Sequence, residues 1–167
     1  DDASSYAEPI MEQVDFGIEM IAILIDTKQK KVSSRGGMQL SVTTSPFYPT
    51  WRKVVADDMQ AMKVAIFNRD INQMGHIAEE NAMRMHALTM SADPAYTYFE
   101  GATLKAINLI KGLREQGINC YYTMDAGPNV KVIYDHQDRQ RIIDKLAPVF
   151  GNDHLIIAQP GPGAHLI

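Results

Sequence analysis

The order of hydrophobic patterns along the chain most constrains its fold. From Phe47 to Met90 the apolar residues follow a helical period of three to four positions. A short apolar run with β-branched residues precedes this segment, and several short β-prone runs follow it. Strands that are separated by a block of helices, rather than alternating with them, are typical of an α+β domain. We therefore expect an α+β fold with a small antiparallel or mixed sheet of about four strands, covered by helices.

The β-prone runs are short and lie at both ends of the chain. Phe16 to Asp26 ("FGIEMIAILID") predicts a buried strand, although an apolar run of this length can also be helical. Asn119 to Tyr134 predicts strand, turn and strand, and His154 to Gln159 a final strand. The Lys-rich segment at 27–31 has the composition of a solvated loop, and "PGPG" at 160–163 that of a rigid turn.

Helix start and stop signals divide the rest of the chain. Pro46 ends a short helix, Asn68-Arg69-Asp70 is a cap within the central segment, and Gly117 closes a later helix. The expected helices are a short one inside "SSRGGMQLSVTTSP", one from Phe47, a long one from Ile71 with Asn81 on its apolar stripe, one from Tyr98 to Gln116, and one from Gln137 to Phe150.

Length and composition exclude several classes of protein. The 167 residues suffice for one domain with a real core, and the net charge of −4 argues against a general nucleic-acid binder. No apolar run approaches the length of a membrane span. A single cysteine, Cys120, excludes an intrachain disulfide and fits a reducing cytosol, so we expect a cytoplasmic protein. Residues 1–15 are polar, are expected to be a linker, and suggest a fragment.

Ser33-Ser34-Arg35-Gly36-Gly37 could bind an anion. Two hydroxyls, a guanidinium and backbone N–H groups at the start of a helix all favour phosphate or carboxylate. The alternative is an ordinary N-cap followed by flexible glycines. The pattern is not a P-loop, because GxxxxGK[ST] is absent.

Asp125 lies at the end of a β-prone run, before Ala-Gly-Pro-Asn. Its carboxylate could form an Asx-type turn by accepting a hydrogen bond from the backbone near Gly127. It could instead act as a general base, or orient a reacting hydroxyl, from a fixed strand end. In that role its ionised form would need a nearby cation or several donors.

The histidines and methionines do not indicate a metal site. The five histidines lack a spacing such as HExxH, and one cysteine makes a structural zinc site improbable. Met83, Met85 and Met90 are expected to fill the core. His86 lies beside the apolar face of its helix, and we expect a buried core histidine rather than a catalyst.

Taken together, "KVSSRGGM" and "YTMDAGPNVKV" resemble the C-terminal half of the diphosphomevalonate decarboxylases, a family of the GHMP kinase superfamily. The long helical segment between the two stretches and the terminal "PGPG" agree with the resemblance, which covers essentially the whole chain. It implies a C-terminal substrate and catalytic lobe at residues 16–167. Residues 1–15 would then be the linker from a missing N-terminal lobe of the same protein.

The resemblance also implies a reaction in isoprenoid synthesis. Such enzymes use ATP and Mg²⁺ to phosphorylate the 3-hydroxyl of mevalonate 5-diphosphate. Phosphate and CO2 then leave, which gives isopentenyl diphosphate and ADP. By this resemblance Asp125 is the general base that faces the hydroxyl, Ser34 hydrogen-bonds substrate near the diphosphate, and Arg35 neutralises its charge. Arg35 would also offer Asp125 a cation.

One departure from the family pattern limits this interpretation. The superfamily's glycine-rich ATP loop is absent from the sequence, so nucleotide and metal ligands stay unassigned and the chain alone is expected to be inactive. Two alternatives stay open: another GHMP-type kinase, such as mevalonate or phosphomevalonate kinase, and a non-catalytic α+β ligand-binding module. The sequence also leaves a homodimer open.

Overall fold

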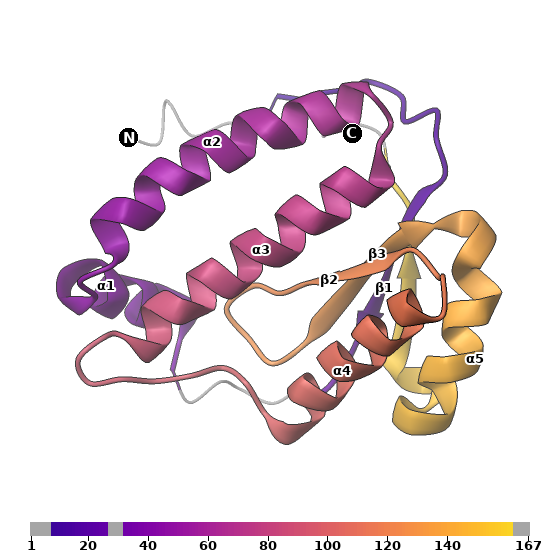
Figure 1. Cartoon of the computed structure of the whole chain (residues 1–167). Helices are drawn as coiled ribbons and strands as arrows, with labels where there is room; N and C mark the ends of the chain where they lie inside the picture. Colours follow the sequence, from indigo (N-terminus) through magenta and orange to yellow (C-terminus); the bar gives the residue numbers. More distant parts are fainter. Residues whose placement is uncertain (1–7, 27–31, 162–167) are drawn as a thin grey trace, which may run out of the picture.

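One antiparallel sheet organises the part of the chain that the structure, a computed structural model, describes: residues 8–26 and 32–161 (Figure 1). The strand order is β2-β3-β1-β4, and every neighbouring pair is antiparallel. The elements are β1 (Ile18–Ile23), α1 (Ser34–Thr44), α2 (Tyr48–Phe67), α3 (Ile71–Met90), α4 (Gly101–Glu115), β2 (Cys120–Thr123), β3 (Val130–Asp135), α5 (Arg139–Phe150) and β4 (Leu155–Ala158). The expected α+β class is confirmed.

One face of the sheet carries the main core. Tyr122 and Tyr134 are fully buried on this face, where helices α4 and α5 cover the strands. The side chains that pack between the helices and the sheet include Ile21, Ile23, Ile107, Ile110, Val130, Val132, Ile142 and Leu146. Cys120 lies in the same core, and burial raises the pKa of its thiol to about 12. A thiol with so high a pKa stays protonated and does not act as a nucleophile.

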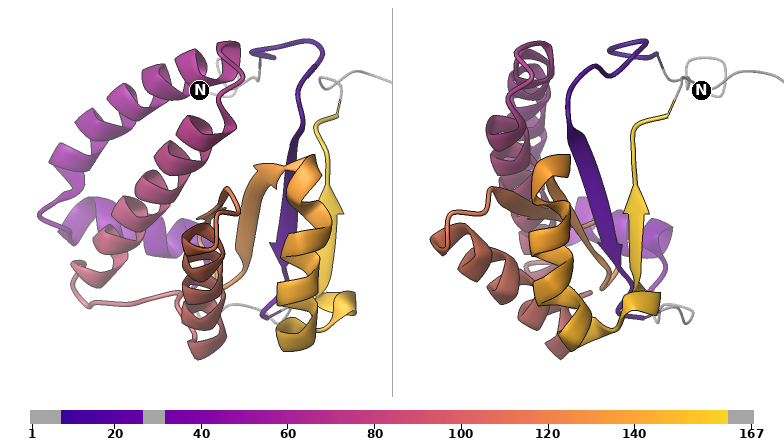
Figure 2. Two further views of the ribbon diagram at one scale, coloured as in Figure 1. Left: turned by 45° about the vertical axis from the view of Figure 1, so that its right-hand side comes forward. Right: turned by 90° about the vertical axis from the view of Figure 1, so that its right-hand side faces the viewer.

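Helices α2 and α3 form an antiparallel pair beside strand β2. Figure 2 shows α3 between α2 and the sheet, in agreement with the packing of α3 on β2 and of α2 on α3. The two helices separate at the expected cap: Arg69 has a left-handed φ of 58°, and the Asp70 side chain accepts a hydrogen bond from the Gln73 N–H. The helical apolar period from Phe47 to Met90 therefore belongs to two helices, with a short break between them.

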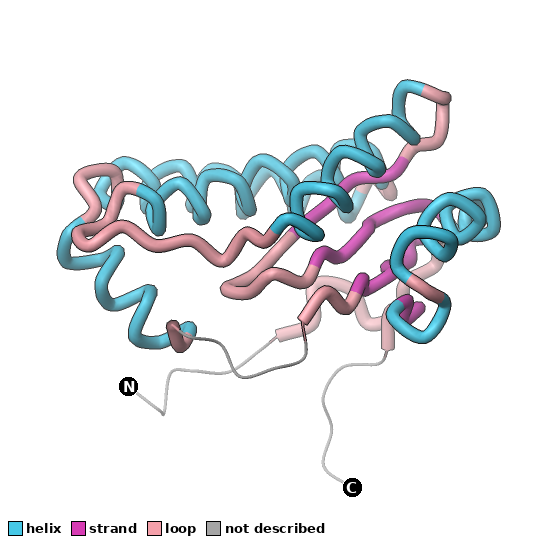
Figure 3. Tube along the Cα trace, turned by 90° about the horizontal axis from the view of Figure 1, so that it is seen from below, coloured by secondary structure: helices cyan, strands magenta, loops and turns pink. Residues whose placement is uncertain are grey.

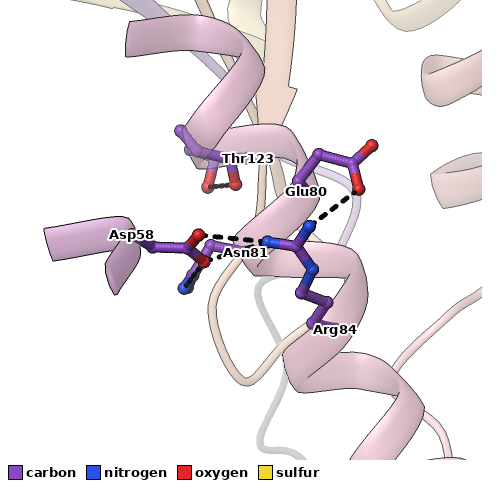
Figure 4. A network of polar contacts seen from close by, with 6 residues as sticks. Asp58, Glu80, Asn81, Arg84 and Thr123 are labelled. Carbon is purple, nitrogen blue, oxygen red and sulfur yellow. Dashed lines mark hydrogen bonds and ion pairs between the residues drawn. The ribbon is translucent and has the colours of Figure 1, made fainter. Parts of the chain in front are cut away.

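The polar Asn81 on the apolar stripe of α3 has a partner in α2. Its side-chain amide donates to Asp58 Oδ2 at 3.0 Å, and Arg84 pairs with the same carboxylate at 3.0 Å (Figure 4). On the sheet side of this network, Thr123 Oγ1 donates to the Ala78 carbonyl at 3.4 Å. Asn81 thus ties α2 to α3 close to the point where β2 ends.

One boundary difference concerns α4, which begins at Gly101 rather than Tyr98. Glu100 and Thr103 form a capping box that fixes this start. Residues 95–100 form neither helix nor strand, and Tyr96 and Tyr98 contact α1. The other expected elements agree with the structure to within a few residues, and Gly117, with φ of 79°, follows α4 as expected.

Some expectations fall outside the described residues. These are the Lys-rich loop at 27–31, residues 1–7 of the linker and the end of "PGPG". Residues 8–15 form neither helix nor strand. None of the described helices combines the length and apolar character that crossing a bilayer requires.

Glu19 is a buried carboxylate that joins four elements of the fold. It is 4% exposed on β1, and it accepts hydrogen bonds from Arg139 at the start of α5, Tyr134 on β3 and Gln159 after β4. The hydrogen bond from Arg139 is the main reason why the pKa of Glu19 falls from 4.5 to about 2, with Gln159 and Tyr134 adding to it and burial opposing it. The folded structure therefore stabilises the ionised form of Glu19.

The ionisation of Glu19 should contribute to the pH dependence of the protein's stability. A carboxyl group whose folded pKa is depressed stabilises the protein above its unfolded pKa, and this contribution is lost as pH falls through the folded value. The window for Glu19 runs from about pH 4.5 down to about pH 2. We expect Glu19→Gln to lower the urea midpoint at neutral pH and to flatten its decline within this window. Parallel declines in the parent and the variant would contradict this assignment.

Candidate active site

The turn between β2 and β3 places Asp125 at the edge of the domain, and two side chains anchor it. Thr103 Oγ1, at the start of α4, donates to the Pro128 carbonyl at 2.9 Å. Asn129 Oδ1 accepts from the backbone N–H of Ile25 at 2.8 Å and of Asp26 at 3.1 Å, just beyond β1. The turn is thereby held to a helix start and to the end of the central strand.

Within this turn the backbone makes the closing hydrogen bond. The Gly127 N–H donates to the Asp125 carbonyl oxygen at 2.7 Å. The Asp125 side chain is 73% exposed, and its Oδ1 lies 2.6 Å from the Lys131 amino group. The carboxylate is thus presented at the surface next to a cation, which is the geometry that a general base at a strand end requires.

The first turn of α1 carries both candidate anion-binding side chains. Ser33 is the N-cap, and its hydroxyl oxygen accepts from the Gly36 N–H at 3.1 Å. Ser34 and Arg35 follow as exposed residues of the first turn. The N-cap alternative is therefore correct for Ser33, and it leaves Ser34 and Arg35 accessible to a ligand at the positive end of the helix dipole.

Gly37 has a packing role in this segment. A Cβ at this position would lie 2.5 Å from the Tyr98 hydroxyl and 2.8 Å from the Tyr96 hydroxyl, so only glycine fits. The same tyrosines hold α1 through hydrogen bonds: Tyr96 pairs with the Ser41 hydroxyl at 2.9 Å, and Tyr98 donates to the Ser33 carbonyl at 3.4 Å. Tight packing on these rings thus fixes the position of Ser34 and Arg35.

His86 on α3 links these tyrosines to the Asp125 turn. Its ring is fully buried, 6.1 Å edge-to-face from the Tyr98 ring and 4.7 Å from the Phe99 ring. Burial lowers the pKa of His86, while the backbone and the charge of Asp125 act in the opposite direction. Burial of His86 is as expected, but neither ring nitrogen has a hydrogen bond of ordinary geometry. The neutral His86 ring thus packs between Tyr98 and the Asp125 turn.

Packing therefore brings the two predicted stretches together. Figures 1 and 3 show the β2–β3 turn directed toward the first turn of α1. A series of contacts links the two stretches: His86 lies next to Asp125 and contacts the Tyr98 ring, and the Tyr98 hydroxyl donates to the Ser33 carbonyl, one residue before Ser34. A carboxylate opposite a hydroxyl and a guanidinium can bind an anionic substrate and take a proton from it.

One functional residue was missed by sequence reasoning. We expected Arg35 to offer Asp125 a cation, and the structure shows the Lys131 amino group beside this carboxylate. The signal was present in the hairpin: Lys131 pairs with Thr123, which lies two residues before Asp125. It could have been found only by assigning the register of the two strands.

Magnesium ligands cannot be assigned to this lobe. Within residues 8–26 and 32–161, no group of three or more His, Cys, Asp or Glu side chains is arranged to hold a metal ion. The described residues therefore form no metal site of their own.

Comparison with known proteins identifies the family. Residues 20–160 match the family model described as the mevalonate 5-diphosphate decarboxylase C-terminal domain. The chain belongs to this family. The diphosphomevalonate decarboxylase of Candida albicans is 26% identical over 136 residues, which cover 81% of this chain and 38% of the relative.

Solved decarboxylase structures share the fold. The mevalonate diphosphate decarboxylase from Staphylococcus aureus is 39% identical, with a TM-score of 0.87 over 94% of this chain and 48% of that one. A structure described as MDDEF in complex with MVAPP, AMPPCP and magnesium is 40% identical, with a TM-score of 0.84 over 88% of this chain and 45% of that one. The chain thus spans less than half of these decarboxylases.

Proposed function

We propose that the protein containing this domain is an ATP-dependent diphosphomevalonate decarboxylase. It converts mevalonate 5-diphosphate into isopentenyl diphosphate and releases ADP, phosphate and CO2. The observation that carries the proposal is the match over residues 20–160, within which Asp125 follows strand β2 and Ser34 and Arg35 lie in the first turn of α1. The complex of MDDEF with MVAPP, AMPPCP and magnesium supports the choice of substrates.

In this proposal the chain's own residues bind the substrate and move one proton. Arg35 pairs with the diphosphate, and Ser34 donates a hydrogen bond near it. Asp125 accepts the proton of the 3-hydroxyl as the hydroxyl oxygen bonds to the γ-phosphorus of ATP and ADP leaves. The C–O bond to phosphate then breaks, and the C–C bond to the carboxylate supplies the electron pair of the new double bond as CO2 departs.

Nucleotide binding falls to the rest of the protein. The sequence lacks a glycine-rich phosphate loop, and the described residues lack a metal cluster. We propose that residues 16–167 are the C-terminal substrate and catalytic lobe, that residues 1–15 are a linker, and that an N-terminal lobe completes the site. The isolated chain would then be inactive.

The direct test is CO2 release by the full-length protein. Radiolabelled mevalonate 5-diphosphate carrying ¹⁴C in the carboxylate should release label only when ATP and Mg²⁺ are present. A mevalonate or phosphomevalonate kinase would consume ATP with its own substrate and retain the label. A ligand-binding module would do neither. Retention of label in the full-length protein would refute the proposal.

Arg35→Lys should weaken mevalonate 5-diphosphate binding more than ATP binding. A lysine keeps the charge, but it cannot reproduce the two parallel hydrogen bonds of a guanidinium to an anion. We expect the Kd for mevalonate 5-diphosphate to rise about tenfold, which is roughly 1.4 kcal/mol, while the Kd for ATP changes little. Calorimetric titration of the full-length protein measures both values.

The matched control is Arg52→Lys, which changes an exposed arginine on α2. It should leave both affinities unchanged. Equal losses for the two ligands in Arg35→Lys would mean that Arg35 is structural or lies nearer the nucleotide.

A further inference from the structure

Lys131 reaches Asp125 because of the register of the β2–β3 hairpin. Thr123 and Lys131 are cross-strand partners, so their side chains lie on the same face of the sheet. Asp125 lies two residues beyond Thr123, and side chains two positions apart along a strand point the same way. The two charged groups are therefore diagonal neighbours, and their atoms meet at 2.6 Å.

The two partners differ in how firmly they are held. The Lys131 side chain is 29% exposed, whereas that of Asp125 is 73% exposed. A lysine stem that packs along its neighbours keeps its amino group at one place on the sheet. The exposed carboxylate gains a fixed contact from a side chain that belongs to the rigid part of the fold.

Titratable groups face Asp125 from two of the elements packed against it. Lys131 approaches from β3, and the buried His86 approaches from α3. Burial lowers the pKa of His86, so this imidazole is neutral at neutral pH. Lys131 brings a positive charge to within 2.6 Å of this carboxylate.

We propose that Lys131 is a positioning residue for the reaction proposed above: it holds the Asp125 carboxylate by Oδ1, ionised and in one orientation, for the substrate hydroxyl. A base has to lie within about 2.6–3.2 Å of the proton that it accepts, so its rotamer matters as much as its charge. An adjacent cation also favours the ionised form of a carboxyl group. From β3, Lys131 both fixes the orientation of the Asp125 carboxylate and favours its ionised form. Arg35 keeps its own role with the diphosphate.

The kinetic test replaces Lys131 in the full-length protein. We expect Lys131→Met to lower kcat about 10–100-fold through loss of alignment, with the KM for mevalonate 5-diphosphate within about threefold of the parent. Lys131→Arg, which retains a cation on the same face, should recover most of kcat. The matched control is Lys145→Met, an exposed lysine on α5 across the opposite face of the sheet. It should behave as the parent.

A second measurement does not depend on activity. Carbon-13 NMR of the aspartate carboxyl groups follows the titration of Asp125, whose signal is the one missing in Asp125→Asn. Lys131→Met should raise its midpoint by roughly 0.5–1 pH unit, a reduced effect because the pair is partly in solvent. Lys145→Met should leave the midpoint in place.

The outcomes separate this inference from the proposed function. A parent protein that releases no CO2 refutes the proposed function, and the titration then still decides whether Lys131 keeps Asp125 ionised. With an active parent, a Met variant that retains the parental kcat overturns the positioning role. A fall in kcat with an unchanged midpoint would show a general structural defect and would overturn it as well.

Discussion

Asp125→Asn in the full-length protein is expected to lower the rate of CO2 release by about 10²–10⁴-fold. Asparagine keeps the shape of the side chain, but its amide cannot accept the proton of the 3-hydroxyl. The backbone hydrogen bond between Gly127 and the Asp125 carbonyl does not involve the side chain, so the turn should survive. Affinity for mevalonate 5-diphosphate should therefore stay within about tenfold of the parent.

Single-turnover kinetics and calorimetric titration measure the two effects separately. Asp144→Asn is the matched control: it makes the same substitution on α5, where the carboxylate accepts from Gln140 on the surface. It should retain parental turnover. If Asp125→Asn kept half of the parental kcat, the assignment of Asp125 as base would be wrong.

The second large effect concerns stability. Arg114→Met is expected to destabilise the 167-residue chain by about 3–5 kcal/mol, the usual result of leaving one charge of a buried pair behind. Arg114 on α4 donates to both carboxylate oxygens of Glu79 on α3, at 2.6 and 2.8 Å. It also donates to the Cys120 carbonyl at 3.0 Å, while Glu79 accepts from the Tyr122 N–H at 3.2 Å. The pair thus links α3 and α4 to β2, the strand that precedes Asp125.

Urea unfolding followed by circular dichroism measures the loss. The double variant Glu79→Gln/Arg114→Met should be more stable than Arg114→Met alone, because it removes the stranded charge. Arg141→Met, which breaks an exposed pair with Asp138, should cost little. A loss in Arg114→Met as small as that of Arg141→Met would mean that the buried pair is solvated in solution.

The helices and strands were readable from the sequence because each has its own period and its own end signals. The apolar stripe from Ile71, with Asp70 as its cap, predicted α3, and the β-branched run after Phe16 predicted β1. The start of α4 was misplaced because Tyr98 suits a helix as well as a loop. In the structure the Tyr98 hydroxyl contacts the N-cap of α1, a segment far away in the sequence.

In the candidate site, too, the sequence predicted the local features, and only the structure showed the contacts between distant segments. Asp125, Ser34 and Arg35 were identified from their short stretches and from the family that these stretches resemble. Turn chemistry at Asp125 and cap chemistry at Ser33 are local, and local residues determine them. The contact between Lys131 and Asp125 is not local, because the register of two strands sets it.

The sequence by itself determined which segments become helices and strands, the cap at Ser33 and the family to which the chain belongs. These depend on residues close together in the chain. Only the tertiary structure decided that Lys131 meets Asp125, that Gly37 is required by two tyrosine rings, and that Glu79 and Arg114 pair in the interior. Strand register and helix packing set such contacts, and both depend on the simultaneous fit of many side chains across the whole core.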